Sequence, residues 1–234
     1  MASVPDLLEH VEYLTDLDVI AITDHDDIRG GYQAREYAER RRFRFDVIVG
    51  AEITTVEGHL LALFIEHPIR SLQSLAKTIV TIHEQGGICI VPHPMSWLTR
   101  SVGQRGFERV MNSAVDGVFF DGIETANATI AGKVSARKVN YLNQTRYRLA
   151  ETGGSDAHFL KLVGTGYTSF PGKTAADLRR SLEAKTTVAH LDTRIGLRSV
   201  SKSEIIRQQF RSLIYMPWQR VQRKLRYSPK GGGE

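Results

Sequence analysis

The chain has 234 residues, 41% hydrophobic and 24% charged, and is long enough to bury a full core as one enzyme-sized domain. Its longest apolar run, Leu60–Ile65, is far too short to span a bilayer, which excludes a membrane-spanning class. No charged segment followed by an apolar one opens the chain, so we expect no secretion and a cytoplasmic location. The single cysteine, Cys89, excludes an internal disulfide framework.

The net charge of +5 is concentrated at the C-terminal end. Residues 195–234 hold nine Lys or Arg and two Glu, a charge of +7, which leaves −2 for residues 1–194. Apolar residues recur at helical spacing between Ile206 and Leu225, with basic residues around them. Such a segment can lie on a membrane surface of anionic lipid, on nucleic acid, or on a protein surface of its own chain or a partner. We therefore predict a globular domain over 1–194 and a basic amphipathic tail over 195–234.

The body of the chain alternates helix-like and strand-like segments. The predicted helices are Val4–Thr15, Ile28–Arg42, Leu72–Gln85, Gln104–Ser113, Ala131–Thr145 and Ala175–Ala184. The predicted strands are Val19–Thr23, Val47–Thr54, His59–Ile65, Ile88–Val91, Gly117–Glu124, Tyr147–Thr152 and Gly164–Phe170. The short link Thr55–Gly58 between two strands predicts a β-hairpin. Apolar strands alternating with amphipathic helices favour an α/β fold with a mainly parallel sheet covered by helices.

Acidic residues and histidines lie at the ends of these strands. The motifs are Thr23-Asp24-His25-Asp26, Gly50-Ala51-Glu52, His59, His93-Pro94 and Gly154-Ser155-Asp156-Ala157-His158. In α/β barrels the carboxyl ends of the strands meet at one rim, where ligand-binding residues gather. Carboxylate oxygens and imidazole nitrogens suit zinc, manganese or iron. The pattern therefore predicts a hydrolytic site with several metal ions at this rim.

Each motif taken alone has a simpler interpretation. An Asp-His pair after a strand is usually a cap or a turn, and Gly153-Gly154-Ser155-Asp156 alone would be a turn before a helix. Their joint occurrence at strand ends favours metal binding. Asp156 and His158 are two residues apart, so an extended backbone would point both to the same side. His10 and His83 lie on predicted helices and are expected to be solvated.

At these motifs the chain resembles the PHP (polymerase and histidinol phosphatase) family of metal-dependent phosphoesterases. The similarity covers roughly residues 1–190 through the segments AITDHD, GAEITTVEGHLLALF, VPHP, DGIETAN, GGSDAHF and VGTGYTSFPGKTAADLRRSL. The resemblance implies a distorted (β/α)7 barrel that holds two or three divalent ions, Mn, Zn or Fe, in a complete site. It also implies a PHP-like hydrolase domain over 1–194.

The resemblance implies a specific set of metal ligands. They are His25, Glu52, His59, His93, Asp156 and His158, with Glu52 bridging two ions and with His25, Glu52, His93 and Asp156 also catalytic. Asp24 and Asp26 flank His25 and would orient its ring. Arg100 and Lys133 are candidates for phosphate contact, although a surface charge explains each of them as well.

These residues favour hydrolysis of phosphate esters by a metal-activated hydroxide. The resemblance suggests nucleotides, short nucleic acids or other phosphorylated small molecules as substrates. An amidohydrolase-type metal hydrolase and a non-catalytic PHP-like binding module stay open as alternatives.

The family opens with a strand that carries His-x-His and a turn with Ser-Asp-Gly, whereas this sequence begins Met1-Ala2-Ser3-Val4-Pro5. The first strand is therefore expected to be missing. We also expect Met1 to be internal to a longer reading frame, or the chain to be a fragment. A chain as short as this is expected to be a weak enzyme or an inactive one.

Overall fold

The computed structural model describes residues 3–192, and the basic tail predicted over 195–234 lies outside these described residues. The α-helices are α1 (Val4–Leu14), α2 (Arg29–Arg41), α3 (Leu75–Glu84), α4 (Gln104–Met111), α5 (Ile130–Leu142) and α6 (Ala175–Glu183). The strands are β1 (Val19–Ile22), β2 (Asp46–Thr54), β3 (His59–Leu63), β4 (Ile88–Val91), β5 (Gly122–Asn127), β6 (Ala150–Gly154), β7 (Gly166–Ser169) and β8 (Val188–Leu191). The predicted alternation of helices and strands is confirmed.

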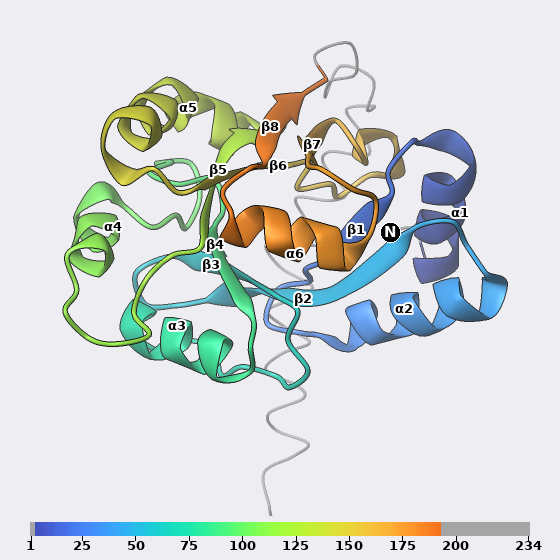
Figure 1. Ribbon diagram of the computed structural model, residues 1–234, viewed down its shortest axis with the longest axis horizontal. Helices are drawn as coiled ribbons and strands as arrows, with labels where there is room; N and C mark the ends of the chain where they lie inside the picture. Colours follow the sequence, from blue (N-terminus) through green and yellow to red (C-terminus); the bar gives the residue numbers. More distant parts are fainter. Residues whose placement is uncertain (1–2, 193–234) are drawn as a thin grey trace, which may run out of the picture. The chain divides into compact units, whose positions relative to one another are not determined.

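Strands β1 to β6 form one curled sheet in their order along the chain (Figure 1). The pairings β1–β2, β4–β5 and β5–β6 are parallel, whereas β3 runs antiparallel to both of its neighbours, β2 and β4. The predicted hairpin at Thr55–Gly58 is confirmed, because Thr54 pairs with His59 across it. Strands β7 and β8 form a separate antiparallel pair. The sheet is therefore mixed, with β3 inserted into an otherwise parallel arrangement.

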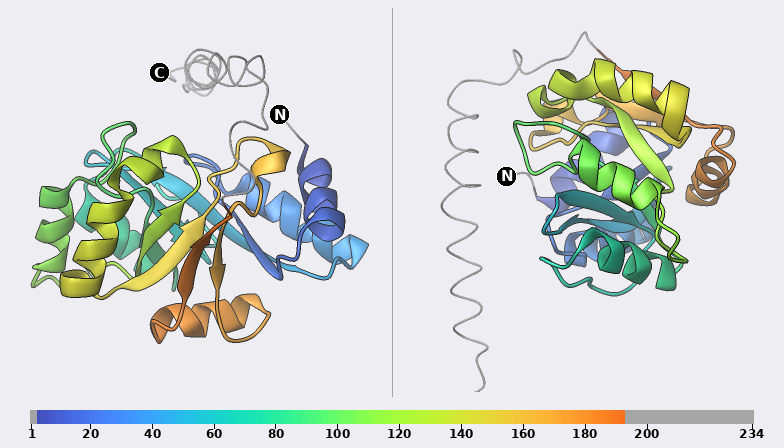
Figure 2. Two further views of the ribbon diagram at one scale, coloured as in Figure 1. Left: turned by 90° about the horizontal axis from the view of Figure 1, so that it is seen from above. Right: turned by 90° about the vertical axis from the view of Figure 1, so that its left-hand side faces the viewer.

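The helices pack on both faces of the sheet. Figure 1 shows α1 and α2 at one end of the sheet and α4 and α5 at the other. Alternate residues of a strand point to opposite faces, and β4 divides accordingly. Cys89 and Val91 belong to the larger core with residues of α3, α4 and α5, whereas Ile88 and Ile90 pack with Leu182 of α6. Both views in Figure 2 show α6 (orange) apart from the other helices.

Local chemistry fixes the helix starts. Ser3 and Asp6 form a capping box at α1, and Thr174 and Asp177 form another at α6. The side chain of Thr129 accepts a hydrogen bond from the backbone at the start of α5. Because Thr129 comes two residues after β5 ends at Asn127, its cap places the end of this strand next to the start of α5.

The bounds of several elements differ from the prediction, and three differences stand out. Helix α5 ends at Leu142 and is followed by a π-helical turn over Asn143–Tyr147, where a longer α-helix was expected. Strand β5 begins at Gly122 rather than at residue 117. Strand β8, which was not predicted, pairs with β7. Strand β8 has only four residues and none of them is fully buried, so its apolar pattern is too short to be seen in the sequence alone.

Two glycines allow the β7–β8 pair to approach the end of β6. A Cβ atom on Gly153 would lie 2.2 Å from the backbone oxygen of Tyr167, and one on Gly166 would lie 2.1 Å from the backbone oxygen of Gly154. The hydroxyl of Thr168 bonds both the N–H and the carbonyl of Gly153. This close approach holds β6 and the loop that follows it. Among residues 3–192, no helix is long and apolar enough to cross a membrane.

Candidate metal centre

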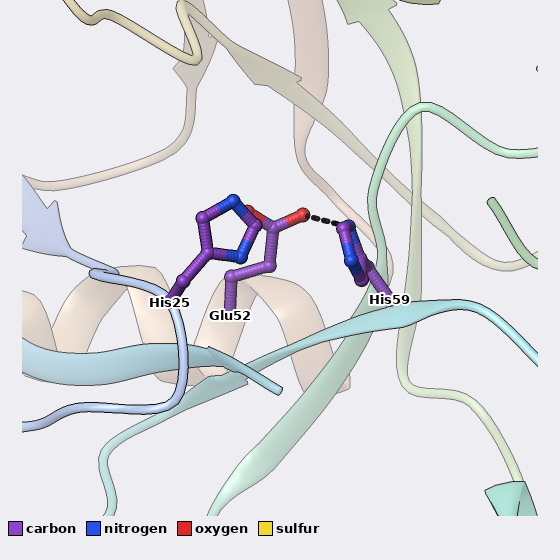
Figure 3. Close-up of side chains that lie close together, drawn as sticks. All are labelled: His25, Glu52 and His59. Carbon is purple, nitrogen blue, oxygen red and sulfur yellow. Dashed lines mark ion pairs between the residues drawn. The ribbon is translucent and has the colours of Figure 1, made fainter. Parts of the chain in front are cut away.

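Three histidine rings surround the carboxylate of Glu52, which lies near the end of β2. The Oε1 atom of Glu52 lies 2.9 Å from Nδ1 of His59 and 3.1 Å from Nε2 of His93. The Oε2 atom lies 3.4 Å from Nε2 of His25. Figure 3 shows the Glu52 carboxylate between the rings of His25 and His59. The structure thus gathers residues from positions 25 to 93 around one carboxylate.

Strand pairing accounts for this arrangement. His59 pairs with Thr54 across the hairpin, and Leu61 pairs with Glu52. Because His59 and Leu61 are two residues apart, the side chains of His59 and Glu52 point to the same face of the sheet as diagonal neighbours. A parallel bridge between His25 and Glu52 brings in the residue that follows β1. The register of β2 against its two neighbours therefore sets the site.

The Nδ1 atom of His59 is buried and makes no hydrogen bond of good geometry, although it lies 2.9 Å from Oε1 of Glu52. A buried polar atom without a hydrogen bond is costly, and its presence calls for an explanation such as an ion. His25, Glu52 and His59 each offer one ligand atom, and all three atoms lie within 4.8 Å of one another. Two imidazole nitrogens and one carboxylate oxygen form a donor set that suits Zn²⁺, Mn²⁺ or Fe²⁺. The residues present therefore fit a divalent metal ion.

The charge of Glu52 is held by these rings. Burial raises the pKa of its carboxyl, but the contacts with His59 and His93 and the charge of His25 outweigh burial, so the pKa is lowered. The carboxylate consequently stays ionised across the physiological range. An ionised carboxylate beside three imidazoles is the form in which these groups bind a cation.

His93 follows β4, and both its backbone and its ring make hydrogen bonds. Its φ angle of +30° is unusual for a residue other than glycine. Its backbone N–H donates a 2.7 Å hydrogen bond to Glu124, and its Nδ1 atom lies 2.9 Å from the hydroxyl of Ser101. Burial lowers the pKa of the His93 ring, but the hydrogen bond to Glu52 and the charges of Glu52 and Glu124 outweigh it and raise the pKa. The ring is thus fixed with Nε2 toward Glu52.

Asp156 and His158 follow β6, but not in the expected extended conformation. Asp156 has a φ angle of +46°, in the left-handed region, so the prediction of an extended backbone at this position is wrong. The structure places the ring of His158 against Asp156, with its Nδ1 atom 3.0 Å from the Asp156 carbonyl oxygen. The pKa of Asp156 is raised by burial first and by the charge of Glu52 second, so the two carboxylates are electrostatically coupled.

The other residues singled out from the sequence take different positions. The Asp26 carboxylate accepts a 2.7 Å hydrogen bond from the Thr54 backbone and so ties its loop to β2. Burial, and then the charge of Asp27, raise the pKa of Asp24. Arg100 is exposed, its guanidinium donates to the Thr55 carbonyl, and its own carbonyl accepts from the His59 N–H. Lys133 is exposed near the start of α5.

Sequence reasoning missed Glu124, which lies in β5 beneath His93. Its carboxylate is buried and accepts hydrogen bonds of 2.7 Å from the His93 backbone and from the Asn127 side chain. Burial raises the pKa of Glu124 to about 7, although both hydrogen bonds oppose the shift. The signal in the sequence is a glutamate inside an apolar strand-like segment, since a charged residue is rarely buried without a partner.

His83 of α3 was expected to be solvated, and this prediction is wrong. Its Nδ1 atom lies 2.8 Å from the Gly117 carbonyl oxygen, and its Nε2 atom lies 2.9 Å from Asp121. The ring of Phe119 stacks on it at 4.3 Å. The imidazole therefore joins α3 to the segment before β5 and belongs to the architecture, away from Glu52.

Part of the sequence matches a known family and two curated proteins. Residues 143–187 match the PHP-associated (PHP_C) family model. Two uncharacterized proteins of Methanocaldococcus jannaschii are similar to the chain. One is 38% identical over 112 residues, 48% of this chain and 59% of that protein. The other is 28% identical over 124 residues, 53% of this chain and 51% of that protein. The chain thus spans a little over half the length of these curated relatives.

Solved structures show the same fold. A Bacteroides vulgatus two-domain protein with a PHP-like metal-dependent phosphoesterase predicted within it matches with a TM-score of 0.58 and 21% identity, over 81% of this chain and 59% of that one. These findings support a PHP family assignment. A Bifidobacterium adolescentis protein described as a metal-dependent phosphoesterase matches with a TM-score of 0.55 and 17% identity, over 79% of this chain and 91% of that one.

Another structure of similar fold is an endonuclease. Endonuclease Q, in complex with a 27-mer duplex substrate carrying an abasic lesion, has a TM-score of 0.54 and 11% identity to this chain. The match covers 77% of this chain and 51% of that one. The expected PHP-like barrel architecture is confirmed, and the curled sheet described above forms about half of such a barrel.

Proposed function

We propose that this chain is a metal-dependent hydrolase of phosphate esters, with nucleotides or short oligonucleotides as its substrates. One observation carries the proposal: the buried Nδ1 atom of His59 makes no directed hydrogen bond and faces the ionised carboxylate of Glu52. His25 and His93 direct nitrogens to the same carboxylate. The structural similarity to metal-dependent phosphoesterases and to endonuclease Q supports the choice of reaction.

In this proposal Glu52, His25, His59 and His93 hold divalent ions, with Asp156 and His158 as the further ligands. Divalent ions bound there would supply Lewis-acid activation of water and neutralise charge on the phosphate oxygens. The chain's residues have three tasks. Glu52 remains ionised because the surrounding imidazoles lower its pKa. His93 is oriented by Ser101 and Glu124. Asp156 adds a second carboxylate, whose pKa the charge of Glu52 helps to raise.

Arg100 and Lys133 complete the proposed site as phosphate contacts. Arg100 belongs to the loop that follows His93. Its backbone carbonyl accepts a hydrogen bond from the His59 N–H, and its guanidinium donates to the Thr55 carbonyl. Lys133 lies in the first turns of α5, which starts three residues after β5 ends. The N-terminal end of a helix favours an anionic group, and a lysine there adds to that effect.

The first experiment measures bound metal. The wild-type protein, Glu52→Gln and His59→Gln would be purified from medium containing zinc, manganese and iron and analysed by inductively coupled plasma mass spectrometry. We expect at least one divalent ion per wild-type chain and a large loss in both variants, because each removes a ligand from the centre. His10→Gln, a substitution on α1, is the control and should keep its metal. Wild-type metal content in Glu52→Gln would refute the proposed centre.

The second experiment measures substrate preference. Bis(p-nitrophenyl) phosphate, p-nitrophenyl phosphate, a short single-stranded oligonucleotide and a cyclic amide would be tested with metal-loaded and metal-stripped protein. We expect metal-dependent turnover of the phosphate esters. Turnover of the cyclic amide alone would support an amidohydrolase. Bound metal without any turnover would support a non-catalytic binding module.

A further inference from the structure

Ser101 lies in the loop between β4 and α4 and makes two contacts with His93. Its hydroxyl donates a 2.7 Å hydrogen bond to the backbone carbonyl of His93, and its Oγ atom lies 2.9 Å from Nδ1 of the His93 ring. A hydrogen bond of 3.0 Å from the Met95 N–H to the Val102 carbonyl closes the base of this loop. Ser101 is therefore held next to His93 by the backbone as well as by its own side chain.

Hydrogen-bond counting shows that Nδ1 of the His93 ring carries a hydrogen. A serine hydroxyl has one hydrogen to donate, and a backbone carbonyl can only accept. The hydroxyl hydrogen of Ser101 is directed to the His93 carbonyl, so Oγ must accept a hydrogen bond from the ring. The Nδ1 atom is consequently a donor to Ser101. Nε2 lies 3.1 Å from Oε1 of Glu52, a carboxylate that can only accept, so Nε2 supplies a lone pair only when a divalent ion takes the place of its hydrogen.

We propose that Ser101 is a positioning residue that holds His93 in the Nδ1–H form and thereby presents its Nε2 lone pair to a divalent ion beside Glu52. The inference rests on the proposed function in one respect, that the centre binds metal. The hydrogen bond to a ligand histidine fixes both the tautomer and the ring orientation. The return contact to the His93 carbonyl fixes the serine itself, so turning the ring would break its hydrogen bond to Oγ of Ser101 and move Nε2 away from Glu52.

His59 and His93 direct different ring nitrogens to Glu52. His59 directs Nδ1 to Oε1 of Glu52, whereas His93 directs Nε2 to the same oxygen atom. The two histidines therefore offer different nitrogens to one point, and the tautomer of each has to be set separately. For His93 the structure assigns this task to Ser101.

The test compares Ser101→Ala, Ser101→Thr and Ser96→Ala with the wild type. Ser96 is the matched control, because its hydroxyl accepts a hydrogen bond from the Leu98 backbone in the same loop. Zinc affinity would be measured by competition with a chelator, and circular dichroism would check that each variant is folded. We expect Ser101→Ala to lower zinc affinity by about 10- to 100-fold. Ser101→Thr, which keeps the hydroxyl, and Ser96→Ala should stay near the wild-type value.

Long-range ¹H–¹⁵N NMR of histidine-labelled protein gives the second readout. In the zinc-loaded wild type we expect His93 to carry hydrogen on Nδ1 and metal on Nε2. Equal zinc affinity of Ser101→Ala and wild type, or metal on Nδ1 of His93, would overturn the inference. If the wild type binds no zinc, the proposed function fails by itself. In that case the hydrogen on Nδ1 of His93 in the metal-free protein decides the inference, because its presence supports the inference and its absence overturns it.

Discussion

The backbone N–H of His93 donates a 2.7 Å hydrogen bond to the buried carboxylate of Glu124, which joins the end of β4 to β5. The same carboxylate oxygen accepts from the side-chain amide of Asn127. His93 has a positive φ angle, a conformation that persists in a residue other than glycine when surrounding contacts hold it. Glu124 thus supports the backbone of His93 from below, while Ser101 holds its ring from the side.

Replacing Glu124 by alanine should therefore destabilise the metal-free protein by about 2–4 kcal/mol, because two buried donors lose their acceptor. Glu124→Gln should cost less, since its amide oxygen can still accept from His93 and Asn127. Urea unfolding followed by circular dichroism measures both changes. An alanine variant as stable as Glu124→Gln would show that these hydrogen bonds contribute little.

Gly154 is the position at which a methyl group would disturb this support most directly. A Cβ atom there would lie 2.1 Å from Oε1 of Glu124, so Gly154→Ala must displace either the carboxylate or the end of β6. We expect a loss of about 1–3 kcal/mol in stability and weaker zinc binding. Gly103→Ala is the control, because no atom lies within 4 Å of the corresponding Cβ position. Equal effects of the two substitutions in urea unfolding and zinc titration would contradict the prediction.

The ion pair between His83 and Asp121 should make stability depend on pH. Burial lowers the pKa of His83, but its hydrogen bonds to Asp121 and Gly117 outweigh burial, and the pKa is raised above the ordinary value. A histidine whose pKa is raised in the folded state stabilises the fold fully below its unfolded pKa of about 6.5. That stabilisation is lost as the pH rises through the folded pKa.

The measurement is the melting temperature of the wild type and His83→Gln at several pH values from 5.5 to 9. At low pH the wild type should have a higher melting temperature than His83→Gln. The difference between the two melting temperatures should shrink as the pH rises. Phe119→Ala, which removes the stacked ring and leaves the ion pair in place, should lower the melting temperature without this pH dependence. A melting-temperature difference between wild type and His83→Gln that grew with pH would contradict the prediction that protonated His83 stabilises the fold.

Phe107 should be a main contributor to the stability of the core. Its side chain is fully buried, with ring centroids 4.8 Å from Phe120 and 4.6 Å from Tyr147. Phe107→Ala should cost about 3–5 kcal/mol, which is a large share of the 5–15 kcal/mol that stabilises a typical domain. Leu14→Ala, at a side chain 71% exposed, should change urea unfolding by no more than about 0.5 kcal/mol. Similar midpoints for both variants would contradict this role of Phe107.

Much of the fold follows from patterns that the sequence carries locally. Caps such as Ser3 with Asp6 and Thr174 with Asp177 fix helix starts within a few residues. Apolar runs such as Ile88–Val91 are buried on both faces, so they predict strands without any knowledge of the partner. Strand β8 and the π-helical turn depend on contacts distant in sequence, and the pattern shows neither.

The sequence by itself determined which residue types stand at the strand ends, and hence that Glu52, His25, His59 and His93 were candidates for one centre. Tertiary structure decided how they meet. The β2–β3 register sets His59 diagonal to Glu52, and the loop after β4 brings Ser101 onto the ring of His93. Tertiary structure also buries Glu124 and gives Asp156 a left-handed rather than an extended backbone conformation. These outcomes depend on pairing between segments far apart in the chain, and local residue patterns do not specify such distances or directions.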